Sequence, residues 1–251
     1  MRNDHPGQGE IPGLRRLWKQ AFGDSDEYLD LFFSVGFDPL RCLCAVDGDR
    51  VAAALYWLDG SCRGKRVAYL YAVATDNAYR GRGLCRKLTE QTHDILKTRG
   101  YSGAVLVPAE PELFEMYRKL GYRTCASVNQ WEAAAGEALL PLRELTGKEY
   151  ARLRRQMLPA GGVVQEGPTL ELLSAMGKFY AGDRVLLTAV REEDKLWVPE
   201  LLGDPKKSPG IVASLGAKLG KFRGPGDAVP FAMYCSLDEA PPPAYLGLAL
   251  D

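Results

Sequence analysis

Hydrophobic positions in the first 75 residues follow first a helical and then a strand-like pattern. Apolar side chains recur every three or four residues across 12–22, which predicts an amphipathic helix, and a second helix is predicted to about residue 34. Three apolar strand-like segments come next. Asp-Gly pairs supply the positive φ of tight hairpin turns, so they are predicted to connect antiparallel strands. The predicted strands are 40–46, 51–58 and 67–75, with turns at 47–49 and 59–60.

Two glycines interrupt the pattern after the third strand, at Gly81 and Gly83, and a helix is predicted from Leu84 to about Lys97. A strand at 101–107, a short helix at 112–120 and a returning strand at 122–131 complete the first half. Residues 1–10 are polar and are expected to be loose.

The pattern partly restarts after a junction of small and polar residues at 133–137. Thr146 and Glu149 have the spacing of a capping box, which predicts a helix start. The later elements are predicted to be helices to about residue 157, at 169–179 and at 208–219, with strands at 184–190, 195–202, 229–237 and 245–250.

This order repeats that of the first half and predicts a diverged internal duplication. The fold class is α+β, with a mixed, mostly antiparallel sheet and flanking helices. We expect two domains, 1–132 and 133–251. The second lacks the glycine turn, because Gly203-Asp204-Pro205 stands at the corresponding place.

Charge and composition narrow the function. The chain has 251 residues, and 32 basic residues balance 32 acidic ones, which argues against a protein that grips long nucleic acid on a broad basic face. The six cysteines include no C-x-x-C pair and the two histidines are far apart, so we expect no metal site. No apolar run reaches the roughly 20 residues of a membrane span, and no secretory signal is present. We expect a cytoplasmic protein with free thiols.

The glycine turn has the features of a phosphate-binding site. Glycines let a backbone approach a ligand closely, and the N–H groups of a helix's first turn favour an anion. The same stretch carries Arg80, Arg82, Arg86 and Lys87, and no acid lies between Asp76 and Glu90. The sequence therefore predicts that this turn holds a pyrophosphate.

Two nucleotide-binding motifs fit the turn poorly. A dinucleotide fingerprint would need a third glycine at position 86, which is arginine, and a βαβ unit around it. A Walker loop needs G-x-x-x-x-G-K-[ST], which no stretch supplies.

The turn resembles the acyl-CoA loop of the GNAT acetyltransferase superfamily, whose motif is Gln/Arg-x-x-Gly-x-Gly/Ala. Here it reads Arg80-Gly81-Arg82-Gly83-Leu84-Cys85, with cysteine at the last position. Residues 10–34 resemble the two opening helices of one bacterial GNAT subgroup, and 113–122 resemble the family's fourth helix and the glycine after it. The resemblance covers roughly the first 125 residues. It implies a GNAT fold, with the second half as a degenerate copy.

The resemblance also implies an acetyl-CoA site and direct transfer of an acetyl group to an amine. The backbone of Val73 and Thr75 would pair with pantetheine, and a backbone N–H near Val73 would stabilise the oxyanion. The implied pyrophosphate loop consists of Arg80, Gly81, Arg82, Gly83, Leu84, Cys85 and Arg86. The acceptor would be an amine of a small molecule or peptide, with no nucleic acid and no membrane as partner; the oligomeric state cannot be read.

Tyr117 falls at the position where the family commonly has the tyrosine that protonates the leaving thiolate. By spacing alone it also completes an apolar helix face. The general base stays open among Glu110, Glu112, a water chain and the C-terminal carboxylate of Asp251.

Cysteines offer one further catalytic alternative. Cys85 at a helix start could be a nucleophile, but it lacks a partner histidine in the sequence, and Cys42 and Cys44 are expected in the core.

Two functions are therefore carried forward. One is an acetyl-CoA-dependent N-acetyltransferase, and the other is a non-catalytic acyl-CoA-binding or regulatory module. The presence of both glycines and Tyr117 favours the first.

Overall fold

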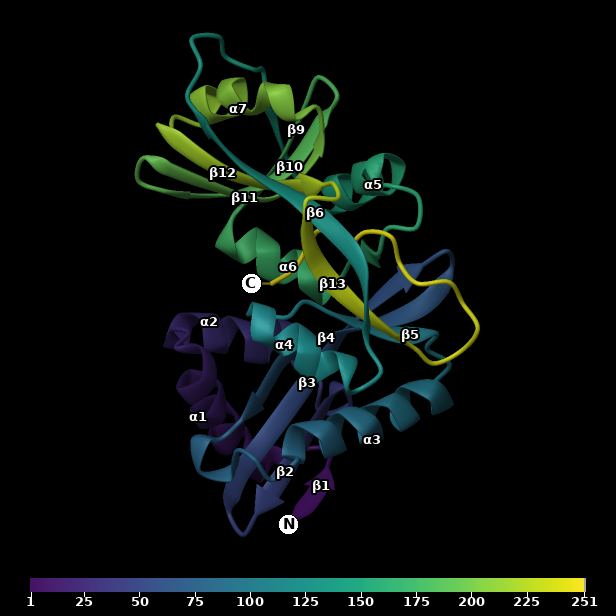
Figure 1. Cartoon of the computed structure of the whole chain (residues 1–251). Helices are drawn as coiled ribbons and strands as arrows, with labels where there is room; N and C mark the ends of the chain where they lie inside the picture. The colour runs from purple at the N-terminus through teal and green to yellow at the C-terminus, as the bar shows by residue number, and fades with distance from the viewer. Residues whose placement is uncertain (251) are drawn as a thin grey trace. The chain divides into compact units, whose positions relative to one another are not determined.

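The computed structural model describes residues 1–250, which form two compact units (Figure 1). The first unit contains 1–106, 110–123 and 234–241, and the second contains 107–109, 124–233 and the described residues after 241. The units are not two successive halves of the chain, because the end of the last strand belongs to the first unit. The predicted domains 1–132 and 133–251 remain a prediction.

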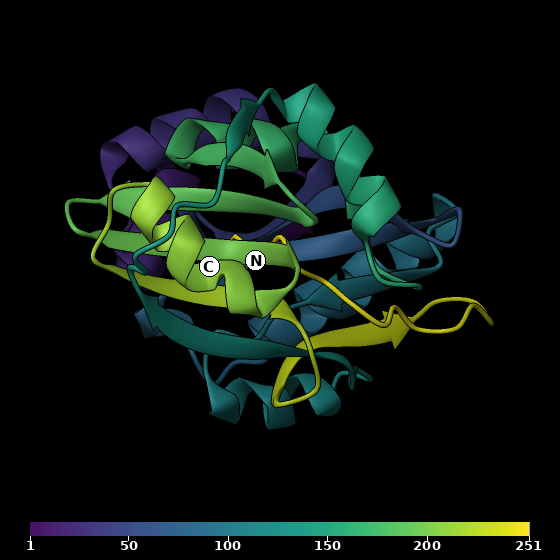
Figure 2. The ribbon, with the colours of Figure 1, turned by 90° about the horizontal axis from the view of Figure 1, so that it is seen from above.

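The first unit is a sheet with helices on both faces. Helices α1 and α2 lie on one side of the strands, and α3 and α4 lie on the other (Figures 1 and 2). The helices are α1 (Ile11–Phe22), α2 (Asp26–Leu31), α3 (Leu84–Thr98) and α4 (Pro111–Arg118), and the strands are β1 (Arg2–Asp4), β2 (Cys42–Asp47), β3 (Arg50–Cys62), β4 (Lys65–Thr75) and β5 (Gly103–Leu106).

Strand pairing in this unit confirms the predicted antiparallel order of three strands. β2 pairs with β3 and β3 pairs with β4, both antiparallel, whereas β5 is parallel to β4 after the α3 crossover. The hairpin turn predicted at 59–60 is wrong: β3 continues to Cys62, and the turn lies at Arg63 and Gly64, which have φ of 51° and 77°. Two consecutive positive φ values match the twist of a hairpin, so this pair sets the register.

The N-terminal segment also differs from expectation. Residues Arg2–Asp4 are not loose but form β1, which pairs antiparallel with β2 at the sheet edge. A strand at an edge needs only backbone hydrogen bonds, so its polar side chains gave no periodic signal.

In the part of the chain that the structure describes, the second unit consists of three α-helices and a mixed sheet. Its helices are α5 (Gly147–Met157), α6 (Pro168–Met176) and α7 (Ser208–Ser214), and its strands are β6 (Arg123–Ala134), β7 (Arg143–Leu145), β8 (Val164–Gln165), β9 (Lys178–Gly182), β10 (Val185–Glu192), β11 (Lys195–Gly203), β12 (Leu219–Pro225) and the start of β13 (Val229–Ser236). The order of its main sheet is β13-β6-β12-β11-β10-β9-β7. The predicted capping box is confirmed, because the Thr146 hydroxyl accepts from Glu149 N and Glu149 accepts from Thr146 N.

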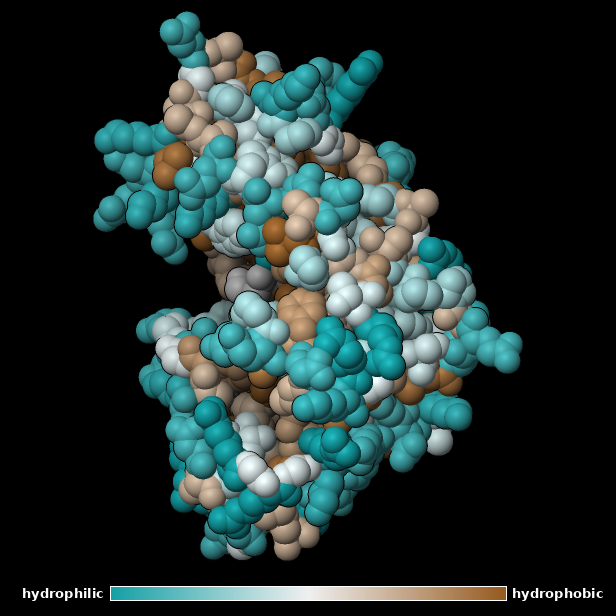
Figure 3. All heavy atoms as spheres, viewed as in Figure 1, coloured by the Kyte–Doolittle hydropathy of each residue, from teal (hydrophilic) through white to brown (hydrophobic). Residues whose placement is uncertain are grey.

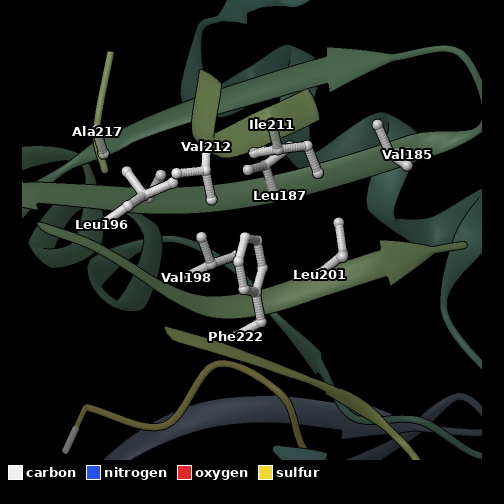
Figure 4. Close-up of a cluster of buried hydrophobic side chains, with 10 residues drawn as sticks. Val185, Leu187, Leu196, Val198, Leu201, Ile211, Val212, Ala217 and Phe222 are labelled. Atoms are coloured by element: carbon white, nitrogen blue, oxygen red, sulfur yellow. The ribbon is translucent and has the colours of Figure 1, made fainter. Parts of the chain in front are cut away.

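Helix α7 packs on one face of β10, β11 and β12 (Figure 4). Its Ile211 and Val212 meet Leu187, Val198 and Phe222 in a cluster of fully buried side chains. Glu200 faces the other side of β11, where Tyr150 and Arg154 of α5 bind it, whereas the next residue, Leu201, points into the α7 cluster. The α7 side of the sheet is thus hydrophobic and the α5 side carries a buried ion pair.

Two predicted helices of this unit are too long, and one predicted strand is not a regular strand. The helix predicted at 169–179 stops at Met176, and Lys178–Gly182 is strand β9. The helix predicted to residue 219 stops at Ser214, before Gly216 with φ of 67°, and Leu219 begins strand β12. The strand predicted at 245–250 is irregular and buried, with a single bridge from Tyr245 to Gly162. In each case long-range pairing or packing overrides the local hydrophobic pattern.

Both units expose mainly hydrophilic side chains on the face in Figure 3, with hydrophobic atoms in small patches. Large hydrophobic side chains exposed within residues 1–250 are Met1, Phe22, Leu40, Leu139, Met176, Leu219 and Val229. Scattered exposed hydrophobics of this kind are ordinary for a globular protein.

Candidate functional site

Strand β4 parts from β5 partway along its length. The parallel pairing joins Val67 to Gly103 and ends with Tyr69 opposite Val105, yet β4 runs on to Thr75. A bulge follows, because the register with β3 shifts between Tyr71 and Ala74, and Ala72 has a φ of 49°. A bulge turns backbone groups out of the ladder. The β5-facing edge of β4 beyond Tyr69 is therefore available to a ligand.

Val73 and Thr75, the predicted pantetheine-binding residues, lie on this segment. Both are half-buried. Val73 directly follows the bulge residue, so its backbone is where the strand changes direction.

The glycine turn joins β4 to α3 as predicted. Gly81 and Gly83 have φ of 75° and 73°, the left-handed region that favours glycine, and a Cβ on either would meet no atom within 4 Å. Gly83 caps α3 without any side-chain hydrogen bond, and the first turn contains no acid. The N–H groups of that turn have no intrahelical acceptor and carry the positive end of the helix dipole.

Arginine side chains surround this turn. Arg80, Arg82 and Arg86 are exposed. The Arg82 guanidinium lies 4.8 Å from the centre of the Tyr79 ring and donates to Ala78 O at 3.1 Å, which fixes it beside the loop. Open backbone donors and nearby cations are the chemistry that a pyrophosphate needs.

Asp76 holds the start of the turn, a role that sequence reasoning missed. Its side chain is 1% exposed and accepts hydrogen bonds from Arg16, Arg50 and the backbone N–H of Ala78. Burial alone would raise the pKa of Asp76, but these hydrogen bonds outweigh it and hold the pKa below its usual value. The only sequence signal was an acid placed directly after a strand and before the glycines.

Asp76→Asn is expected to lower the free energy of unfolding at neutral pH by about 2 kcal/mol, because hydrogen bonds to an ionised carboxylate are lost. Since the native pKa lies below the unfolded one, about 3.9, the carboxylate stabilises above that pH and its contribution disappears as pH falls through the native pKa. Denaturant unfolding at pH 7 and at acid pH should show the variant and wild type converging at acid pH. Asp30→Asn, at an exposed ion pair, should change little; a difference that persists at acid pH would contradict this role.

Tyr117 lies in α4 and is 6% exposed. Its hydroxyl makes no hydrogen bond within the part of the chain that the structure describes, and the Tyr122 ring meets it edge-on with centroids 5.6 Å apart. Burial raises the pKa of Tyr117, with a smaller contribution from the nearby Cys85, so the phenol stays protonated at neutral pH.

Cys85 lies beside Tyr117 in the first turn of α3. Burial raises the pKa of its thiol, and the nearby Thr89 side chain opposes this rise only in part. Cys85 is therefore a neutral thiol near pH 7, which argues against the nucleophile alternative.

Among the described residues, the side chains of Glu110 and Glu112 make no hydrogen bond or ion pair with this segment. Glu110 and Glu112 are exposed, and Asp251 lies outside the described residues. Cys42 and Cys44 are buried in β2, as predicted. Within residues 1–250, no three His, Cys, Asp or Glu side chains gather as a metal site would require, and none of the helices is long and apolar enough to span a membrane.

The second unit has no comparable turn. Gly203 is followed by a short 3₁₀ turn at Pro205–Lys207 and then α7. The parallel pairing of β11 with β12 also ends at Val198, but here Arg223 donates to Pro199 O at 3.0 Å, and a Cβ on Gly247 would overlap the Glu200 carboxylate. The unit's own side chains and C-terminal segment fill this part of its sheet.

A cavity of about 640 Å³ lies in the second unit, between the start of α5, the end of α6 and strands β9–β11. None of the predicted site residues lines it.

Comparison with known proteins agrees with this geometry. The family described as an acetyltransferase (GNAT) domain matches residues 4–125. No curated protein matches the sequence. Among solved structures, a GCN5-related N-acetyltransferase from Anabaena variabilis is 19% identical, with a TM-score of 0.74 over 94% of this chain and 73% of its own.

Two further solved structures share the fold. A GCN5-related N-acetyltransferase from Kribbella flavida is 19% identical, with a TM-score of 0.70 over 93% of this chain and 70% of its own. A putative acetyltransferase from Pyrococcus horikoshii is 12% identical, with a TM-score of 0.64 over 94% of this chain and 89% of its own. The predicted α+β class and GNAT fold are confirmed. The match over residues 4–125 identifies this part of the chain as a GNAT acetyltransferase domain.

Proposed function

We propose that the protein is an N-acetyltransferase that transfers an acetyl group from acetyl-CoA directly to an amine of a small molecule or peptide. The observation that carries the proposal is the strand β4, which leaves β5 after Tyr69 and leads into a glycine turn with open helix N–H groups. The edge of β4 at Val73 and Thr75 would pair with pantetheine, and the loop would hold the pyrophosphate on residues Arg80, Gly81, Arg82, Gly83, Leu84, Cys85 and Arg86.

The reaction needs no covalent enzyme intermediate. The amine nitrogen attacks the thioester carbonyl carbon, a C–N bond forms, and the C–S bond breaks. The amine gives up one proton to solvent water, the departing sulfur takes one from Tyr117, and the resulting tyrosinate regains a proton from solvent. Holding both reactants in one place can supply about 7–11 kcal/mol of the barrier, and the backbone N–H near Val73 would stabilise the developing oxyanion.

The protonated state of Tyr117 supports its role as the proton donor. A phenol in a buried position remains neutral and so keeps the proton that it would donate, because charging it would cost desolvation energy. The same desolvation also makes the departing thiolate more basic, which offsets the weaker acidity of the buried phenol.

Gly83→Ala tests the loop. We expect the Kd for acetyl-CoA to rise about tenfold, since a left-handed φ of 73° is strained for alanine and the new methyl group stands where the ligand approaches. Gly100→Ala is the matched control: Gly100 has a φ of 76°, equally open surroundings and a place at the far end of α3. Both variants should lose similar stability, but only the first should lose affinity in calorimetric titration. If both variants bound acetyl-CoA with the same affinity, the proposal that this loop binds the pyrophosphate would be wrong.

Activity is tested by measuring thiol release from acetyl-CoA in the presence of an amine library. Turnover with at least one amine supports the enzyme. Binding of acetyl-CoA, seen as a raised Tm, without turnover on any amine would instead favour the non-catalytic acyl-CoA-binding module.

A further inference from the structure

Tyr117 needs support from its neighbours to act as a directed proton donor. Its hydroxyl makes no hydrogen bond among the described residues, so packing alone fixes the ring. The Tyr122 ring supplies that contact at 5.6 Å and 69°, and the Tyr122 N–H donates to Tyr117 O at 3.1 Å, which ties the two residues through the backbone as well.

Tyr122 is itself held by His93. Its side chain is fully buried, and its hydroxyl lies 2.8 Å from His93 Nε2. A buried phenol without a partner is costly, so this hydrogen bond decides how the Tyr122 ring sits.

His93 is fixed at both ring nitrogens. Its Nδ1 lies 3.9 Å from the Cys235 sulfur, at the end of β13 within the same unit. Burial lowers the pKa of His93, so the ring is neutral near pH 7 and has one donor and one acceptor nitrogen to share between Tyr122 and Cys235.

The sequence places His93 on the face of α3 that meets these tyrosines. Cys85, Thr89 and His93 are spaced by four residues and so share one side of the helix. Cys85 lies beside Tyr117 at one end, and His93 binds Tyr122 at the other. These three polar side chains therefore form one row on α3 that faces Tyr117 and Tyr122.

We infer that His93 is a positioning residue for Tyr117, acting through the Tyr122 hydroxyl. The inference rests on the proposed function, because it gives Tyr117 the task of protonating the leaving thiolate. His93 takes no part in the proton transfer. Its hydrogen bond fixes the Tyr122 ring, and the Tyr122 ring packs against Tyr117.

The experiment compares full-length His93→Ala, Tyr122→Phe and the double variant with wild type. Each should lower kcat about tenfold while KM for acetyl-CoA stays within twofold, since misplacing a catalytic group costs rate rather than binding. The double variant should match the singles, because both changes break one hydrogen bond. His93→Gln, which can still bond the phenol, should recover most of the rate, and Asp94→Asn, exposed on the same helix, should resemble wild type.

A second readout needs no acceptor. With tyrosine labelled at ¹³Cζ, the Tyr117 resonance should shift or broaden in His93→Ala and Tyr122→Phe and stay unchanged in Asp94→Asn. Tyr117→Phe belongs in the same kinetic series. If Tyr117→Phe keeps full activity, the proposed donor is wrong. If it loses activity while His93→Ala keeps kcat and the Tyr117 resonance, the donor stands and the positioning role is overturned.

Discussion

Tyr117→Phe is expected to lower kcat for acetyl transfer about 100-fold, with KM for acetyl-CoA changed less than twofold. The variant loses one hydroxyl and keeps the ring against Tyr122, so the fold around α4 should persist. General acid catalysis contributes typically 10²–10⁴-fold, and an interaction made only in the transition state affects kcat rather than ground-state binding.

Steady-state thiol release with an amine that supports turnover measures this effect. The pH profile gives an independent check: the pKa of Tyr117 is raised by burial, so the donor is protonated throughout the neutral range. Wild type should therefore show no loss of kcat from this group as pH rises through 8. Leu113→Ala, on the same helix, serves as a packing control and should affect stability more than kcat. An unchanged kcat in Tyr117→Phe would mean that another group donates the proton.

Glu200→Gln is expected to destabilise the second unit by about 3–5 kcal/mol, because it leaves the Arg154 charge buried without a counter-charge. Glu200 is 0% and Arg154 2% exposed, and they are joined at 2.6 and 2.9 Å. Tyr150 also donates to Glu200 at 2.8 Å, so the pair anchors α5 to β11.

Hydrogen exchange of the β10–β12 amides measures the effect on the second unit itself. Glu144→Gln breaks an exposed ion pair with Lys178 and should change stability by less than about 1 kcal/mol. Arg154→Met combined with Glu200→Leu should regain much of the loss, since no unpaired charge is left. A Glu200→Gln variant as stable as wild type would show that the pair contributes nothing.

Many helix starts in both units could be predicted because their signals are local. The opening helix, the Gly83 start of α3 and the Thr146–Glu149 capping box depend on residues within one or two turns of each other. The glycine turn is the clearest case, since its chemistry comes from backbone groups whose geometry the two glycines permit.

Other features depend on contacts that no local pattern encodes. The Ala72 bulge follows from the register with β3, and the Asp76 contacts join residues 26 and 60 positions apart in sequence. The strand next to β5 is the end of β13, where Tyr234 donates to Ser102 O, instead of the strand that directly follows α4. The order of strands in a sheet is set by tertiary packing. A prediction from sequence instead pairs each strand with one that is close to it in the chain.

The sequence alone determined that a glycine turn with basic side chains stands between a strand and a helix, and that Tyr117 lies on a later helix of the same half. Both follow from residue type and short spacing. Only the tertiary structure decided that β4 leaves β5 at Tyr69, that Asp76 secures the turn, and that His93 and Tyr122 support Tyr117. Such contacts arise when distant segments pack, and their energies depend on burial that only the folded chain creates.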